Sequence, residues 1–226
     1  MVRSAIFVAG AVMLGAGAPA AAEETVAPPS AVVHGHSVIH PASQLTVRIP
    51  KSATYVGSDR FDLYGVADAE VQVFAEAGKD KRVTKLYWIQ FESYWPSQPD
   101  KSYNYTGDRR EQHWGTTVWM NGGPHFTTGA TRPGGDRAHV QAMLERAGYK
   151  VPAEMMTVRM VQLLDDPTGT GHGRHELMFI YAEDLASTGK TVAELTDAKG
   201  EAKASWEPIG KALDKRALNA FAVVRK

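Results

Sequence analysis

Three predicted β-strands carry apolar side chains on both of their faces, and this feature restricts the fold more than any other. Residues 86–95, 155–164 and 175–182 have the length and the aromatic or aliphatic content of strands. Because alternate residues of a strand point to opposite sides of a sheet, neither face of these segments is uniformly polar. A sheet that is apolar on both sides must be covered on both sides. Helices are expected to cover one face, and the other face to meet the curled sheet, a second copy of the chain or a ligand.

Shorter patterns supply the other strands. Apolar and polar residues alternate over 45–49 and 71–77, and a further strand is predicted at 116–120. The following Asn121-Gly122-Gly123 predicts a hairpin turn, since Asn and Gly accept a positive φ.

Helix signals appear in the second half of the chain. Asp136 is predicted to cap a helix, Thr191 and Glu194 to form a capping box, and Ser205 to cap a last helix before a strand at 218–224. We therefore expect the α+β class: a single domain with a curved, mostly antiparallel sheet and two or three helices packed on one face.

Residues 1–22 have the pattern of a cleavable secretory signal peptide. Arg3 precedes an apolar run of about 14 residues, and Ala20-Ala21-Ala22 stands directly before Glu23-Glu24. The run is shorter than the roughly 20 residues of a membrane-spanning helix, so no stable membrane anchor is expected after cleavage.

The segment after the predicted cleavage site indicates how the mature chain is organised. Residues 23–31 include Pro28-Pro29 and small side chains, which predicts a flexible tether. Residues 32–226 are long enough for one α+β globular domain, and they show no internal repeat.

Composition narrows the compartment and the partners. The chain has no cysteine, which is unusual for a eukaryotic secreted domain and favours a soluble bacterial protein exported to the periplasm or the medium. The 25 basic and 25 acidic residues balance, so neither nucleic acid nor an anionic membrane surface is an expected partner. Glycine-rich stretches lack the context of a phosphate-binding or dinucleotide-binding loop, and no cofactor is expected.

The candidate site lies in an aromatic-rich region, where nine of the chain's 20 aromatic residues fall between positions 87 and 119. A strand at 86–95 directs Tyr87, Ile89, Phe91 and Trp95 to the core and mixes rings with polar groups on its other face. Such a mixed face is typical of a small-molecule cavity. The residues predicted to bind a ligand are Trp88, Gln90, Glu92, Tyr94, Trp114, Trp119 and Arg159.

Three functions are compatible with that face. The first is a non-enzymatic exported domain that binds a small amphipathic or sugar-like ligand on the rings, with Glu92 or Arg159, a potential buried pair, orienting it. The second is a hydrolase in which Glu92 works with His113 or His175 in acid/base catalysis, although no nucleophile motif supports it. The third is an envelope interaction module that buries the face against a partner or in a homodimer.

Three histidines near the start of the predicted domain raise the alternative of a metal site. His34, His36 and His40 have the spacing of ligands on a strand, but no carboxylate lies among them and Pro41 ends the segment. No metal site is expected.

Overall fold

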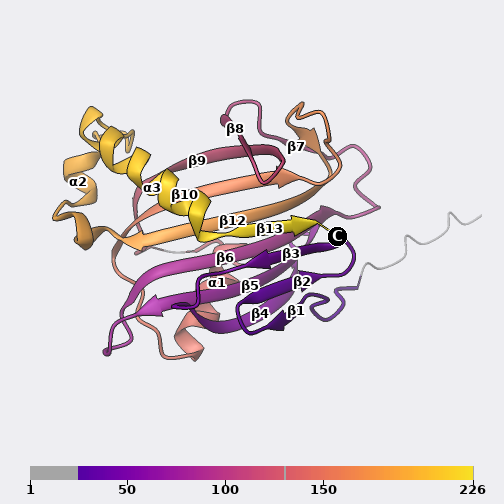
Figure 1. Ribbon diagram of the computed structural model, residues 1–226, viewed down its shortest axis with the longest axis horizontal. Helices are drawn as coiled ribbons and strands as arrows, with labels where there is room; N and C mark the ends of the chain where they lie inside the picture. Colours follow the sequence, from indigo (N-terminus) through magenta and orange to yellow (C-terminus); the bar gives the residue numbers. More distant parts are fainter. Residues whose placement is uncertain (1–24, 130, 226) are drawn as a thin grey trace, which may run out of the picture.

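The computed structural model describes residues 25–129 and 131–225 of the 226-residue chain. The predicted signal peptide at 1–22 lies outside the described residues. Seven strands form an open antiparallel sheet in the order β4-β5-β6-β12-β10-β9-β8 (Figure 1). They are β4 (Thr54–Leu63), β5 (Ala67–Ala77), β6 (Val83–Tyr94), β8 (Arg109–His113), β9 (Thr116–Phe126), β10 (Glu154–Leu163) and β12 (His175–Asp184).

Two smaller sheets complete the strand content. The order β1-β2-β3-β13 joins strands from the two halves of the chain, and β7 pairs with β11. These strands are β1 (Val32–His34), β2 (Ser37–His40), β3 (Leu45–Arg48), β7 (Tyr103–Asn104), β11 (His172–Gly173) and β13 (Ala222–Arg225).

Helices are few. The α-helices are α1 (Asp136–Arg146), α2 (Val192–Leu195) and α3 (Glu207–Ala220), and the 3-10 turns are η1 (Leu185–Thr188) and η2 (Ala204–Trp206). A single-domain, sheet-rich fold with antiparallel sheets is therefore confirmed.

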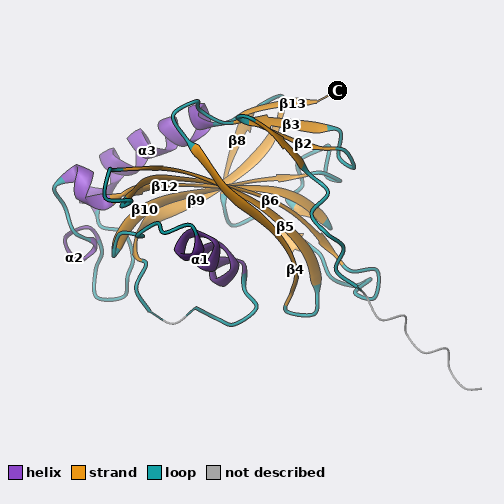
Figure 2. Ribbon diagram, turned by 90° about the horizontal axis from the view of Figure 1, so that it is seen from below, coloured by secondary structure: helices purple, strands orange, loops and turns teal. Residues whose placement is uncertain are grey.

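The helices lie on both faces of the main sheet (Figure 2). On one face, α3 and the small β1-β2-β3-β13 sheet cover Tyr87, Ile89 and Phe179. On the opposite face, α1 packs Val140 and Leu144 in the same cluster as the Trp88 side of β6. The expected packing of all helices on one face is thus not confirmed, because a sheet that is apolar on both sides draws a helix to each side.

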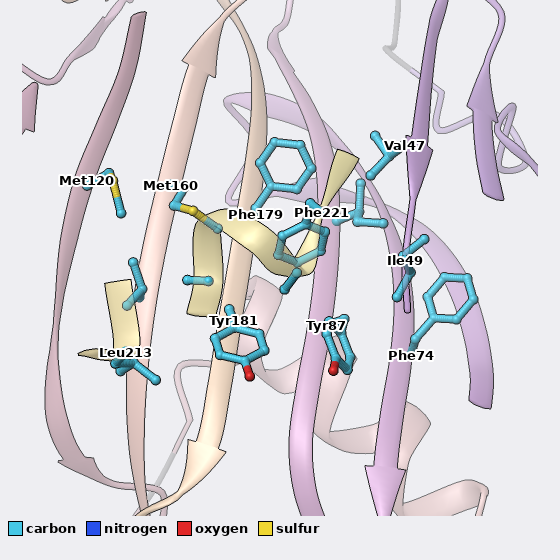
Figure 3. Packing of buried hydrophobic residues seen from close by; sticks show 14 of the residues in the cluster. Val47, Ile49, Phe74, Tyr87, Met120, Met160, Phe179, Tyr181, Leu213 and Phe221 are labelled. Carbon is cyan, nitrogen blue, oxygen red and sulfur yellow. The ribbon is translucent and has the colours of Figure 1, made fainter. Parts of the chain in front are cut away.

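The face beneath α3 holds the larger core (Figure 3). Phe179 is fully buried, and its ring centroid lies 4.8 Å from that of Phe221 and 5.0 Å from that of Trp114. Leu213 of α3 is also fully buried in this cluster. The alternation predicted for 86–95, 155–164 and 175–182 matches the division of their side chains between the two cores.

The hairpin predicted at Asn121-Gly122-Gly123 is wrong. Strand β9 continues through these residues to Phe126, and Gly122 pairs with Val158 of β10. A Cβ on Gly122 would come within 2.3 Å of the Thr157 carbonyl oxygen, so this glycine permits a close strand contact. The hairpin turn is instead Trp114-Gly115, whose φ angles of 51° and 75° match a type I′ turn between β8 and β9.

Element ends in the second half also differ from the predictions. Gly135, not Asp136, is the N-cap of α1, and the Asp136 side chain accepts a hydrogen bond from the backbone N–H of Arg137. The last helix begins at Glu207 after a 3-10 turn that contains Ser205, and it extends to Ala220, so the last strand is shorter than predicted. The Thr191–Glu194 capping box is confirmed.

The segment before β1 contacts the main sheet. The backbone N–H and hydroxyl of Ser30 each donate to Glu70 at 2.8 Å, and the Ala31 N–H donates to Glu70 at 2.6 Å. Arg60 donates to the Pro28 carbonyl at 3.2 Å. Within the predicted tether, Pro28, Ser30 and Ala31 therefore have hydrogen-bond partners on β4 and β5.

Candidate functional site

A cavity of about 510 Å³ lies between α1 and the main sheet. Its sheet side is formed by side chains of neighbouring strands: Leu86, Trp88, Met155, Thr157, Ile180 and Ala182. Val140 and Leu144 of α1 face them, and polar side chains complete the lining: His125, Asp136, Arg137, Gln141, Glu145 and Lys150. The volume lies in the range of small-molecule sites, which combine an apolar lining with a few polar groups.

The position of α1 explains why this space is open. The helix packs against β4 and β5, at one side of the sheet. The apolar side chains of β12 and β10 on the same face, among them Ile180 and Met155, extend beyond the helix. An apolar surface that one short helix covers only in part leaves a hollow along the helix.

Trp88 connects the cavity to a buried polar network. Its indole N–H donates to Oε1 of Gln90 at 2.9 Å, and Nε2 of Gln90 donates to Oε2 of Glu92 at 2.7 Å. These three side chains are two residues apart on β6, so the strand itself places them in a row on one face. Tyr103 closes the row by donating its hydroxyl to Oε1 of Glu92 at 2.6 Å.

Glu92 faces a second buried carboxyl group, Glu176. The two residues are direct cross-strand partners in β6 and β12, and only 7% and 2% of their surfaces are exposed. Tyr105 donates its hydroxyl to Oε2 of Glu176 at 2.6 Å. Burial, and then the charge of Glu92, raise the pKa of Glu176 to about 8, while burial also raises the pKa of Glu92. The pair therefore retains a proton at neutral pH.

Asp136 links the carboxyl pair to the cavity. It lines the cavity at the start of α1, and its charge contributes to the raised pKa of both Glu92 and Glu176. Burial also raises the pKa of Asp136 itself. A third carboxyl group therefore lies within electrostatic range of the pair, at the edge of the cavity.

Arg159 does not pair with Glu92, contrary to the prediction. Its guanidinium donates to Oδ2 of Asp108 at 2.6 Å and lies 5.1 Å from the ring centroid of Tyr105. Two strand spacings separate β10 from β6, because β12 lies between them. In the described part of the chain, the buried Nε of Arg159 has no hydrogen-bond partner.

The structure brings together some of the predicted ligand-binding residues and separates others. Trp88, Gln90 and Glu92 form the row on β6, and Trp119 belongs to the core cluster on the same face. The Tyr94 ring lies 4.5 Å from that of Tyr103. Trp114 packs in the opposite core, because the turn at Trp114-Gly115 directs its ring toward Phe179.

The two histidines considered as partners for Glu92 lie on the side of α3. His113 contacts the Leu218 carbonyl through Nε2 at 3.3 Å, and His175 contacts the Ser93 hydroxyl through Nδ1 at 2.8 Å. The sequence-based site omits Tyr103 and Tyr105, although a spacing of two can place both side chains on one side of an extended segment.

Other site types find little support in the described residues. Residues 25–129 and 131–225 contain no cluster of three or more potential metal ligands. His36 contacts the Ala53 carbonyl, and His40 stacks on Phe91 with ring centroids 3.8 Å apart. None of the helices in these two ranges has the length and hydropathy needed to span a membrane. Comparison with protein-family models, curated proteins and solved structures finds no match to the chain.

Proposed function

We propose that this protein is an exported binding domain that holds a small amphipathic molecule between α1 and the main sheet. The observation that carries the proposal is the cavity of about 510 Å³ with an apolar floor and charged groups at its edge. The export part rests on the signal-peptide pattern of residues 1–22.

The lining favours a ligand with one apolar and one polar end. Leu86, Ile180 and Met155 provide aliphatic surface beside the Trp88 ring, which suits a hydrocarbon chain or the face of a ring. At the edge, Arg137 and Lys150 supply positive charge and Asp136 supplies a carboxyl group. Such groups orient a polar head while the apolar floor supplies most of the affinity.

Binding is tested by titrating the full chain with four probes: dodecanoate, dodecylamine, a neutral dodecyl glycoside below its micelle concentration, and maltose. We expect saturable binding of at least one dodecyl compound by calorimetry, with a change in tryptophan fluorescence. Maltose is expected to bind more weakly, because the cavity floor offers few polar partners for a free sugar.

Two variants locate the site. Thr157→Phe fills the cavity from β10, since Thr157 lines it and is only half-buried, and should weaken binding at least about tenfold, or roughly 1.4 kcal/mol. Trp88→Phe should remove most of the fluorescence response, whereas the matched Trp114→Phe, on the other side of the sheet, should retain it. Unchanged affinity in a folded Thr157→Phe variant would rule out the cavity.

A further inference from the structure

The Glu92–Glu176 pair is closed off by one short segment, residues 102–107, which we call the lid. This segment contains β7 and contributes both tyrosine hydroxyls that reach the pair, from Tyr103 and Tyr105. The two tyrosine rings are stacked, with centroids 6.3 Å apart. A single stretch of chain therefore contributes a tyrosine hydroxyl to each of the two carboxyl groups.

Both ends of the lid are fixed to the rest of the fold. Before it, the Arg174 guanidinium donates to the carbonyl oxygens of Gln98, Pro99 and Lys101 at 2.7, 2.9 and 2.5 Å. After it, Asp108 accepts hydrogen bonds from Arg159 at 2.6 Å and from Asn121 at 3.1 Å.

Between these anchors, the lid is held by few contacts. Among the described residues, its strand pairs only with the two-residue β11, through His172 and Gly173, and the Tyr105 N–H donates to the Gly171 carbonyl at 2.9 Å. Its contacts with the main sheet are the two tyrosine–glutamate hydrogen bonds and ring contacts: Tyr103 lies against Tyr94 of β6, and Tyr105 packs on the core cluster beneath α1 and under Arg159 of β10. A short segment with fixed ends and few internal contacts can open without unfolding the domain.

The charges around the pair do not neutralise it. Tyr94 of β6 and the two lid tyrosines are neutral, and Asp136 of α1 adds a further acid. Arg159 of β10 is the cation whose charge lowers the pKa of Glu176, but it is paired with Asp108. Arg174 lies over the Tyr94 ring, at 5.8 Å from its centroid, with its donors on backbone carbonyls. Ionisation of both glutamates thus places two buried negative charges side by side.

We propose that residues 102–107 form a pH-sensitive lid, closed while the Glu92–Glu176 pair holds a proton and released when both carboxyl groups are ionised. Release would expose Gln90 and Glu92 and extend the neighbouring cavity along the row that begins at Trp88. The proposal stands independently of any ligand in that cavity.

The direction of the pH dependence follows from proton binding in the two states. With the lid open, both carboxyl groups face water and titrate near their ordinary pKa of about 4.5. With the lid closed, the pKa of Glu176 is about 8. Between these values the closed state binds more protons, so raising the pH through this window favours opening. Below about pH 4.5 both states are protonated, and above about pH 8 the dependence levels off.

The test is hydrogen–deuterium exchange of the full chain at pH 6 and pH 9, corrected for the intrinsic pH dependence of amide exchange. We expect protection of the amides at 102–107 to fall at least about tenfold at pH 9, since each unit of pKa difference corresponds to a factor of ten over the window. Amides of α3 that exchange through local fluctuations serve as the internal reference and should not change, because only amides exchanging through global unfolding follow the overall stability.

Variants assign the effect to the pair. Glu176→Gln cannot ionise but still offers an oxygen to Tyr105, so its lid should show equal protection at both pH values. Glu183→Gln is the matched control: Glu183 is also buried on β12, 7% exposed, but accepts two hydrogen bonds from Arg216 on the other side of the sheet. This variant should keep the wild-type loss of lid protection.

A pH-independent lid in the wild type, or the same loss in Glu176→Gln, would overturn the proposal. Should Glu176→Gln fail to fold, Glu92→Gln replaces it, because either substitution leaves one carboxyl group that can ionise alone. Carbon-detected NMR of the glutamate carboxyl groups in the wild type provides the further check: a carboxyl resonance that titrates near pH 8 supports the pair, and the absence of one contradicts it.

Discussion

The two faces of the main sheet treat buried glutamates differently. On the side of α3, Glu183 receives the Tyr181 hydroxyl at 2.6 Å and the Arg216 guanidinium at 2.7 and 3.0 Å. On the side of α1, Glu92 and Glu176 each receive a tyrosine hydroxyl at 2.6 Å, but no guanidinium within the described residues. On the α3 side the negative charge of the buried glutamate is therefore neutralised by a guanidinium group. On the α1 side the two buried carboxyl groups have no such partner in the part of the chain that the structure describes.

This difference separates stability from function. The face beneath α3 combines a continuous aromatic and aliphatic core with a neutralised carboxylate, which is what a stable domain requires. The face beneath α1 has an open cavity and buried acids without bound cations, features that lower stability and are concentrated at functional sites. If the two faces have these separate roles, truncation of a core side chain should cost more stability on the α3 side, and removal of a carboxyl group should increase stability on the α1 side.

The largest effect is expected from Phe179→Ala, compared with Ile180→Ala next to it. Phe179 is fully buried among aromatic rings, whereas the Ile180 side chain lines the cavity on the opposite face. Truncation should cost about 3–5 kcal/mol of unfolding free energy at Phe179 and about 1–2 kcal/mol at Ile180. Urea unfolding of both variants measures the two costs, and equal losses would contradict the proposed division.

A smaller effect, with a defined pH dependence, is expected from Glu176→Gln. Because the folded-state pKa of Glu176 is raised from 4.5 to about 8, the wild type should lose stability as the pH rises between these two values. The variant lacks this loss and should be more stable than the wild type by about 1–3 kcal/mol at pH 9. Urea unfolding at several pH values measures it; parallel profiles for the two proteins would show that Glu176 does not titrate in this range.

The smallest effect is expected from Gln162→Met. Gln162 is fully buried on β10, and in the described part of the chain its amide oxygen and nitrogen have no hydrogen-bond partner. An apolar side chain of similar length removes this unsatisfied group, so a gain of about 0.5–1.5 kcal/mol is expected. Thermal unfolding measures the gain; a loss would show that the amide is satisfied by buried water.

Sequence reasoning identified features set by local pattern. Alternation over 86–95 and 175–182 correctly separated the two faces, and the Thr191–Glu194 capping box is present. These features depend on neighbouring residues alone, which is why the sequence contains them.

Sequence reasoning did not predict the features that depend on contacts between distant segments of the chain. Sequence reasoning predicts a turn at Gly122. In the structure, the lack of a side chain at Gly122 permits the close approach of the Thr157 carbonyl from the next strand. Strand order decides which helix covers which face of the sheet, and it also brings Arg159 to Asp108. The alternation of apolar and polar residues does not encode that order. The tyrosines at 103 and 105 reach the glutamates only because a loop folds back over β6 and β12.

The pairing of β3 with β13 also has a consequence for the order of folding. Leu45–Arg48 forms its ladder with Ala222–Arg225, so its paired residues are 174 to 180 positions apart in the sequence. Because contacts between remote segments require the intervening chain to be ordered first, this ladder is expected to form late. A nascent chain that still lacks Phe221 and β13 cannot complete the core over Tyr87 and Phe179, so that core forms only after these residues have been synthesised.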